Sequence, residues 1–206
     1  PGLLLYTHYW SFYLIAVVGA LLIWQAWRSA DATQRHAARS ALVALVAGAI
    51  TFLPWIPTFL YQSAHTGTPW GDAIFVTASF AFGLRDFAGG EHSEAYALLV
   101  VLIMLVIVAV FGRAIDRYRI ELDARTRPGV RVETLTWVGT LLLGGAFAFV
   151  TRGTFAGRYA SILYPLFVLV VAYGITVFAD KRIRAVLLAV VVIIGLGSSL
   201  RSVADN

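Results

Sequence analysis

The sequence predicts an all-α fold, a polytopic membrane bundle of about six transmembrane helices with a short interfacial helix on its outer side. Hydrophobic residues make up 60% of the 206 residues and charged residues only 13%, and the mean hydropathy is +0.81. Soluble domains, in contrast, are roughly half apolar and a quarter charged. The charges also fall in short breaks between apolar runs. They therefore indicate loops between spans, and they argue against nucleic acid as a partner despite a pI near 9.8.

Six apolar runs are long enough to cross a membrane, which takes about 20 mostly apolar residues for roughly 30 Å of hydrocarbon. They cover residues 7–27, 41–61, 95–111, 135–151, 160–179 and 185–200. Residues 2–6 have the composition of the end of an earlier span. Since the chain opens at Pro1 and its only methionine is Met104, we expect residues 1–206 to be one transmembrane region of a longer polypeptide, with the N-terminal spans and first external loop missing.

Basic residues divide unevenly between alternate connections, and short cytoplasmic loops collect Lys and Arg. Connections 28–39, 113–131 and 181–184 hold 12 of them, and the other set holds 4, namely Arg85, Arg152, Arg158 and Arg201. Residues 30–39, 113–131 and 181–184 are therefore predicted to lie in the cytoplasm, with both chain ends outside. We expect these basic loops to set the topology and to contact anionic lipid.

The outer end of the second span carries Pro54 and Pro57, which each remove an amide donor and should kink or unwind the helix near the surface. The longest external segment, residues 62–94, follows it. Asp72 is placed there to cap a short helix over residues 73–82. At about 1.5 Å per residue this helix is too short to cross, so a membrane-surface or re-entrant position is predicted.

Aromatic residues crowd the outer ends of the spans, and the ordinary explanation is the interfacial belt of membrane proteins. That belt accounts for each of four residues taken singly: Trp10, Trp55, Tyr61 and Trp70. His8 and His65 occupy the same regions, and an imidazole can donate a hydrogen bond to a phosphate or a hydroxyl. A solvated interfacial histidine is the alternative for both.

Two arginines lie in the short outer connection before the span 160–179, on the side where positive charge is disfavoured. The guanidinium fork of Arg152 or Arg158 matches a phosphate, and the helix N-terminus that follows adds backbone donors. Snorkelling to lipid headgroups is the alternative. Arg85 and the carboxylates of residues 86–94 are expected in a solvated loop, although two such carboxylates could act as a base or as metal ligands.

The chain lacks several kinds of reactive site. Cysteine is absent, which excludes disulfides, thiolate metal sites and cysteine nucleophiles within these residues. No phosphate-cradling glycine loop, zinc-ligand spacing or serine elbow occurs. We therefore expect no metal and no cofactor.

Several short motifs together resemble a known family. They are Tyr6-Thr7-His8-Tyr9-Trp10, Phe52-Leu53-Pro54-Trp55-Ile56-Pro57, Tyr61-Gln62, His65-Thr66-Gly67-Thr68-Pro69-Trp70, Gly157-Arg158-Tyr159 and Tyr164-Pro165. In this order the chain looks like the later half of bacterial GT-C glycosyltransferases, the multi-spanning enzymes related to protein O-mannosyltransferases of family 39 and to the aminoarabinose transferase of lipid A.

The resemblance implies inverting transfer of a sugar from a polyprenyl-phosphate donor to a glycan, lipid or protein acceptor, at the extracytoplasmic face of a bacterial plasma membrane. In that family the acidic base lies in the first external loop, so no catalytic residue is carried over, and we expect the chain alone to be inactive. The resemblance assigns donor-phosphate or sugar contact to Arg158, Tyr159, His8 and Tyr9. The further substrate-binding candidates are His65, Arg152 and Arg85.

Three other classes remain open. A multi-spanning transporter is the main rival, but transporters usually place ionisable residues or broken helices near the midplane and often show paired halves, which these spans lack. A polysaccharide polymerase or ligase of lipid-linked glycans also fits, although its long external loop should hold several basic residues and residues 62–94 hold only Arg85. A structural scaffold leaves the outward arginines beside prolines without a role.

Overall fold

The computed structural model describes residues 1–65, 75–123, 128–151 and 157–204, and the side chains of Pro128 and Arg158 lie outside this described part. The chain divides into two compact units. The first comprises Pro1–Val76 with Gly139–Phe155, and the second comprises Thr77–Val138 with Ala156–Asn206.

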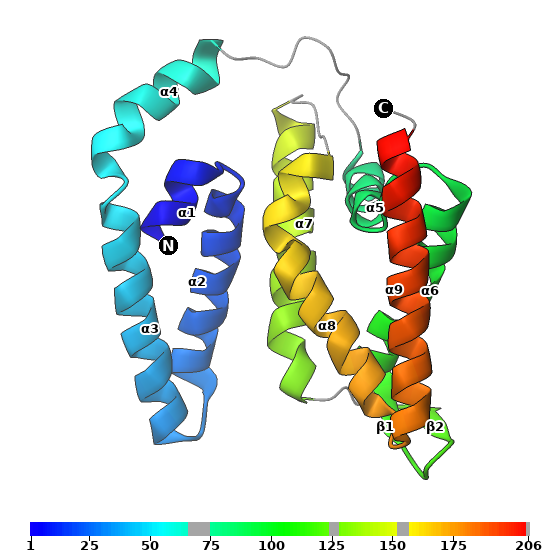
Figure 1. Cartoon of the computed structure of the whole chain (residues 1–206). Helices are drawn as coiled ribbons and strands as arrows, with labels where there is room; N and C mark the ends of the chain where they lie inside the picture. Colours follow the sequence, from blue (N-terminus) through cyan, green and yellow to red (C-terminus); the bar gives the residue numbers. More distant parts are fainter. Residues whose placement is uncertain (66–74, 124–127, 152–156, 205–206) are drawn as a thin grey trace. The chain divides into compact units, whose positions relative to one another are not determined.

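Among the described residues, six helices are long and apolar enough to cross a membrane, which confirms the predicted all-α polytopic fold (Figure 1). They are α2 (Ser11–Arg28), α3 with α4 (Ala32–His65), α6 (Ser93–Phe111), α7 (Pro128–Val150), η2 with α8 (Tyr159–Val177) and α9 (Lys181–Ala204). Helices α3, α7 and α9 begin several residues before the predicted apolar runs. Arginine is a good helix former, so the basic first turns continue the helix instead of ending it.

The first unit opens with a short helix, α1 (Gly2–Thr7), that ends before α2 begins. The predicted start of this span at residue 7 is wrong, because His8 is extended with φ −155° and interrupts the helix. The helix restarts at Ser11, whose hydroxyl donates to the Leu4 carbonyl over 2.9 Å. This bond joins the start of α2 to α1.

The predicted kink in the second span is confirmed as a 3-10 turn between two helices. The elements are α3 (Ala32–Ile50), η1 (Leu53–Trp55) and α4 (Ile56–His65). The Trp55 N–H donates to the Phe52 carbonyl, three residues back, so the Thr51 carbonyl loses the partner it would have in an α-helix. The Tyr6 hydroxyl of α1 donates to this carbonyl over 2.6 Å instead. Helix α1 thus stabilises the kink.

The second unit is built around α6, α8 and α9. Of these, α8 covers Tyr164–Val177. The further elements of the unit are nearly all of α5 (Val76–Phe87), the first half of α7, β1 (Gly112–Ala114), β2 (Ile120–Leu122) and η2 (Gly157–Leu163). Helices α6 and α8 meet closely at Gly174, where an ideal Cβ would lie 2.1 Å from the Leu105 carbonyl oxygen. Glycine is therefore required at this crossing.

The predicted short interfacial helix is α5, but with different bounds. It covers Val76–Phe87 and not residues 73–82, while the capping residue Asp72 lies outside the described residues. Its 12 residues give a length of about 18 Å, too short to cross the hydrocarbon.

Helix α5 extends further than predicted because its buried stripe continues. The stripe repeats every four residues, as one face of a helix requires: Ser79, Gly83 and Phe87. Arg85 and Asp86 consequently belong to α5, so the prediction that they lie in a solvated loop is wrong.

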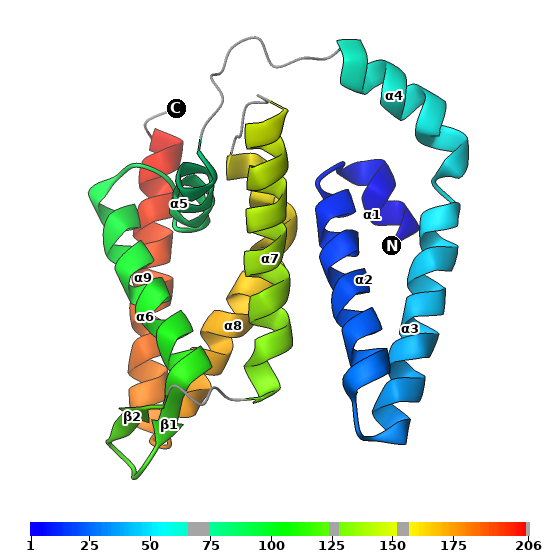
Figure 2. The same cartoon turned by 180° about the vertical axis from the view of Figure 1, so that it is seen from behind.

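The antiparallel hairpin of β1 and β2 is absent from the predicted fold. Gly112 pairs with Leu122 and Ala114 pairs with Ile120. The Asp116 carboxylate accepts a hydrogen bond from the Tyr118 N–H over 2.8 Å and so closes the turn. Figure 2 shows the hairpin at the end of the second unit opposite α5.

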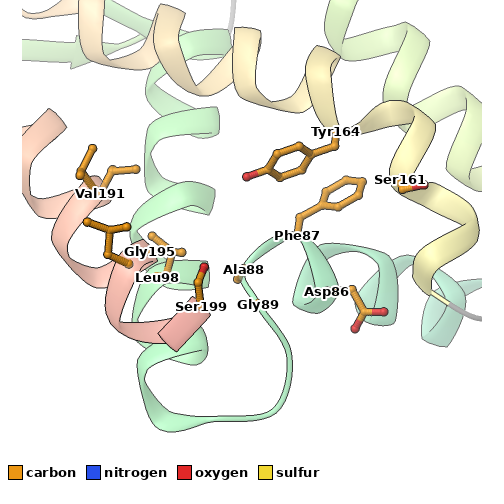
Figure 3. A pocket seen from close by; sticks show the side chains of 12 residues that line it. Asp86, Phe87, Ala88, Gly89, Leu98, Ser161, Tyr164, Val191, Gly195 and Ser199 are labelled. Atoms are coloured by element: carbon orange, nitrogen blue, oxygen red, sulfur yellow. The ribbon is translucent and has the colours of Figure 1, made fainter. Parts of the chain in front are cut away.

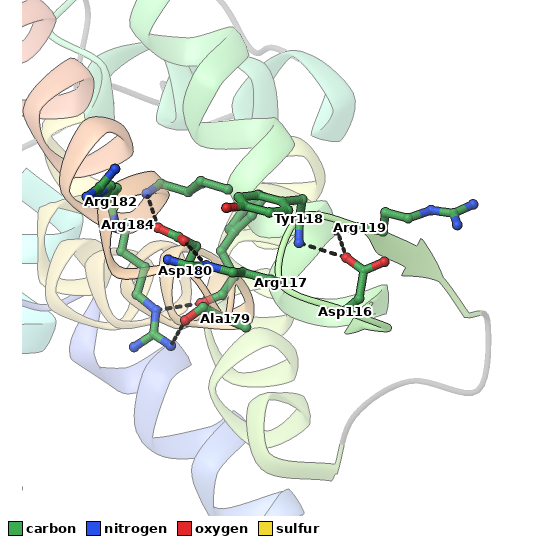
Figure 4. Close-up of polar contacts among 10 residues, drawn as sticks. Asp116, Arg117, Tyr118, Arg119, Ala179, Asp180, Arg182 and Arg184 are labelled. Carbon is green, nitrogen blue, oxygen red and sulfur yellow. Dashed lines mark hydrogen bonds and ion pairs between the residues drawn. The ribbon is translucent and has the colours of Figure 1, made fainter.

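An ion pair joins the hairpin to the turn between α8 and α9 (Figure 4). The Arg117 guanidinium donates to the carboxylate of Asp180, which is almost fully buried and also accepts from the Arg182 N–H over 2.6 Å. The two connections predicted to be cytoplasmic therefore lie together at one end of the second unit. The other end carries the α5–α6 connection.

Candidate functional site

A pocket of about 610 Å³ lies in the second unit, between the end of α5, the start of α8 and the C-terminal half of α9 (Figure 3). Its polar lining residues are Asp86, Ser161, Tyr164 and Ser199. Its apolar side chains come mainly from α6 and α9, namely Leu98, Val191, Val192 and Leu196.

The pocket extends along one face of α9. Val191, Gly195 and Ser199 are spaced by four residues and so share a face, over about 12 Å at 1.5 Å per residue. Ser199 lies near the end of α9 that is predicted to face outward, and Val191 lies nearer the middle of the helix. The pocket is therefore polar towards the predicted outer surface and apolar towards mid-membrane.

Three residues that line the pocket carry hydroxyl groups. Within the described residues, those of Ser161, Tyr164 and Ser199 have no hydrogen-bond partner. In Figure 3 the Tyr164 ring lies beside Phe87 and its hydroxyl points towards α9. These groups are consequently available to a ligand.

A tight strap, residues 88–90, contributes Ala88 and Gly89 to one wall of the pocket. Gly89 and Gly90 have φ of +104° and +112°, a backbone conformation that side-chain-bearing residues rarely adopt. The buried Ser198 hydroxyl donates to the Ala88 carbonyl over 3.0 Å. A Cβ on Gly89 would lie 2.3 Å from that hydroxyl oxygen. The strap is thus held against α9 by one hydrogen bond and by the absence of a side chain.

Aromatic rings in edge-on and tilted contacts support the wall opposite α9. The Phe87 ring centroid lies 5.6 Å from that of Tyr164 and 5.1 Å from that of Phe167. Phe167 in turn packs edge-on against Trp137, at 5.5 Å. Such contacts restrict the rotamers of the rings, so the pocket wall is preorganised.

The charged groups near the pocket mouth are paired with one another. Arg85 lies 3.4 Å from the Asp86 carboxylate and also pairs with Glu91. Arg201 lies 3.2 Å from Glu94. A substrate phosphate or hydroxyl would therefore compete with two carboxylates, those of Asp86 and Glu91, for the Arg85 guanidinium.

The arginine candidates of the outer connection are only partly described. Arg152 and the side chain of Arg158 lie outside the described residues. The backbone places Arg158 and Tyr159 in η2, shortly before the pocket residue Ser161. Tyr159 is half-buried and does not line the pocket.

The other candidates belong to the first unit. His8 Nδ1 accepts the Trp10 N–H over 3.3 Å, so the neutral ring carries its proton on Nε2. Partial burial lowers the pKa of His8 below its usual value. The Tyr9 hydroxyl donates to the Gln62 side-chain oxygen and accepts from the Trp55 indole N–H over 3.4 Å. Tyr9 thus has a structural role between α2 and α4.

His65 ends α4 in an exposed position. Its Nδ1 donates to the Tyr61 carbonyl over 2.8 Å, and its ring stacks on that of Tyr61 at 4.1 Å. The neutral imidazole therefore presents Nε2 as an acceptor. The predicted donation to a phosphate would require the protonated ring.

None of the residues that line the pocket is among the predicted substrate-binding candidates. Ser161 and Ser199 lie in apolar segments, and single serines in such segments are too common to signal a site. Gly195 and the neighbouring pair Ser198-Ser199 offered the only local signal, since small residues in a span indicate a close contact or a cavity.

The function of this chain is inferred from the arrangement of its residues, because the comparisons with known proteins found no match. No protein-family model, curated protein or solved structure matches this chain. The resemblance to GT-C glycosyltransferases accordingly stays a prediction from short motifs.

Proposed function

We propose that this chain is the later, membrane-embedded part of a glycosyltransferase that moves a sugar from a polyprenyl-phosphate donor to an acceptor at the extracytoplasmic face of a bacterial plasma membrane. The observation that carries the proposal is the pocket of the second unit. It combines three hydroxyls without a partner among the described residues and the Asp86 carboxylate at its polar end with an apolar face along α9. Such a lining suits an amphiphile with its headgroup at the membrane surface and its chain in lipid.

The position of η2 supports a donor phosphate beside this pocket. Arg158 precedes Ser161 by three residues, which is one turn of a 3-10 helix, with a rise of about 6 Å. A guanidinium can pair with two phosphate oxygens at once, which makes arginine better suited than lysine to orient a phosphate diester. A phosphate held at Arg158 would therefore lie within one turn of the polar end of the pocket.

The proposed reaction is a single displacement. An acceptor hydroxyl oxygen attacks the anomeric carbon from the face opposite the phosphate and forms the new glycosidic bond with inversion. The bond from that carbon to the phosphate oxygen breaks, and its electron pair leaves with polyprenyl phosphate. The acceptor proton passes to a base, which is expected outside this chain.

Arg158 contributes most at the transition state in this account. Negative charge develops on the leaving phosphate as the bond breaks, and a fixed guanidinium stabilises that charge more than it stabilises the bound donor. The described residues around the pocket bind and orient the reactants.

Replacing Arg158 with Ala in the full-length protein tests the proposal. Charge-assisted hydrogen bonds contribute about 1.5–3 kcal/mol, so kcat/KM for a polyprenyl-phosphate sugar should fall roughly 10- to 150-fold. Arg201→Ala is the matched control, since Arg201 belongs to the same end of the unit and pairs with Glu94. Unchanged donor kinetics in Arg158→Ala, measured in nanodiscs, would remove this residue and the proposed donor site.

A further inference from the structure

The charge around the pocket mouth favours an uncharged ligand. Within the described residues, its guanidinium groups are those of Arg85 and Arg201, and carboxylates hold both. The carboxylates there outnumber them, since Asp86, Glu91 and Glu94 are all present. Among the described side chains that line the pocket, an anionic headgroup would lie next to Asp86 with hydroxyls alone to bind it.

A ligand with hydroxyl groups can form hydrogen bonds with the polar residues that line the pocket. A carboxylate only accepts hydrogen bonds, whereas serine and tyrosine hydroxyls both donate and accept. A ligand hydroxyl can therefore donate to Asp86, and a second ligand oxygen can accept from Tyr164 or Ser199. An uncharged headgroup with two or more hydroxyls satisfies these groups without placing like charges together.

The apolar part of the pocket is open along one side. Val192 and Leu196 are 47% and 60% exposed, so a hydrocarbon chain can enter from the surrounding lipid. Gly195 leaves the floor clear, because a Cβ there would meet only Leu98 Cδ2, at 3.8 Å. The pocket thus accommodates one chain next to a polar headgroup.

From these observations we infer that the pocket binds the acceptor of the proposed reaction, and that this acceptor is an uncharged lipid bearing hydroxyl groups. The inference rests on the proposed function. It separates the two substrates: the anionic donor phosphate binds at Arg158 on η2, and the acceptor hydroxyl binds at Asp86 and Ser161. One 3-10 turn, about 6 Å, separates Arg158 from Ser161, which suits a phosphate and a hydroxyl on opposite sides of one anomeric carbon.

The test uses the full-length protein in phosphatidylcholine nanodiscs and a monoacylglycerol with a photoreactive group in its acyl chain. After irradiation, mass spectrometry measures the labelling of the α9 peptide. We expect labelling of α9, and we expect polyprenyl phosphate at equal mole fraction not to compete. In Asp86→Asn the repelling charge is gone, so polyprenyl phosphate should begin to compete.

Two glycines on α9 provide matched variants. Gly195→Leu fills the pocket floor and should lower labelling at least about fivefold, because the inserted side chain takes the space of the probe. Gly197→Leu removes a glycine two residues further along the same helix, where a Cβ meets nothing within 4 Å, and should leave labelling unchanged. Gly195→Ala, whose Cβ makes an ordinary contact, gives the same direction of change if the leucine variant does not fold.

Three results would overturn the inference: no labelling of α9, equal loss of labelling in the Gly195 and Gly197 variants, or competition by polyprenyl phosphate in the wild type. The last result would make the pocket a donor site and leave the proposed function standing. Failure of the proposed function itself is distinct, since it would show as unchanged donor kinetics in Arg158→Ala.

Discussion

The two units use the polar groups of their predicted outer ends in opposite ways. In the first unit, the hydroxyls of Tyr6 and Tyr9 and the indole N–H of Trp55 are bonded to other groups of the same unit. In the second unit, Ser198 is bonded to the strap, whereas the three pocket hydroxyls have no partner among the described residues. The polar groups of the first end hold a kinked helix in place, whereas three hydroxyls of the second are left available to a ligand.

Ser198 and Ser199 show the difference between a polar group bonded within the protein and one that lines the pocket. Adjacent serines in one helix face different surroundings: Ser198 is buried and bonded, and Ser199 lines the pocket. A buried polar group without a partner costs stability. Substitutions at bonded positions should therefore affect folding, and those in the pocket should affect binding.

The strap should give the largest effect on stability. Gly89→Ala places a Cβ where φ is +104° and where the Ser198 hydroxyl would lie 2.3 Å away. Backbone strain of about 1–3 kcal/mol and overpacking of about 1–3 kcal/mol should both lower the free energy of unfolding in mixed micelles. Gly90→Ala is the control, since its φ is similar but its Cβ would meet nothing within 4 Å. Equal losses in the two variants would show that Ser198 does not pack on the strap.

Ser198→Ala should give the next largest effect. It leaves the buried Ala88 carbonyl without a donor, which costs about 1–3 kcal/mol, and it loosens the strap. Ser199→Ala removes an exposed hydroxyl of the same helix and should change stability by less than about 0.5 kcal/mol. The comparison between the units would fail if the two alanine variants unfolded alike.

Tyr6→Phe should destabilise the first unit by about 0.5–1.5 kcal/mol, because the Thr51 carbonyl loses its donor at the kink. Tyr61→Phe is the control, since Tyr61 is exposed and contributes a stacked ring rather than a hydroxyl bond. Hydrogen exchange along α4 should rise in Tyr6→Phe alone. Unchanged exchange would show that α1 does not stabilise the kink.

The smallest expected effect is a difference in pH dependence. Burial lowers the pKa of His8 in the folded protein, so the stability it supports is present above the unfolded pKa of about 6.5 and is lost as pH falls through the folded value. In the second unit, the Arg117 hydrogen bond and the Arg182 N–H lower the pKa of Asp180. Its contribution is present above an unfolded pKa of about 3.9 and is lost only below that.

Lowering the pH from 7.5 to 5 should therefore lower the free energy of unfolding of the wild type slightly, and that of His8→Gln by less. Asp180→Asn should keep the pH dependence of the wild type over this range. A steeper slope in His8→Gln would contradict the pKa shift of this residue.

Much of the fold follows from the sequence because hydropathy and length decide which segments cross a membrane. The kink at Pro54 and Pro57 was predictable for a local reason, because a proline removes an amide donor from its own backbone whatever the tertiary structure. The start of α2 was missed because Ser11 depends on a hydrogen bond to Leu4, and the hairpin was missed because its residues are as polar as a loop.

The pocket could not be predicted in the same way. Asp86, Ser161 and Ser199 come from three segments that only tertiary packing brings together. None of the three is unusual in its own segment. The sequence signals at the outer face, the histidines and arginines, are individually rare residues in a membrane protein, but His8, His65 and Arg85 each bond within their own unit.

The proposed function requires the polar end of this pocket to face the outside of the membrane. Residues 1–206 contain no cysteine, so in a cysteine-free background of the full-length protein a single substitution reports position directly. Ser199→Cys in intact cells should react with a membrane-impermeant maleimide, and Tyr118→Cys, in the hairpin at the other end of the unit, should react only after the membrane is opened. Labelling of Tyr118→Cys in intact cells together with protection of Ser199→Cys would contradict the account.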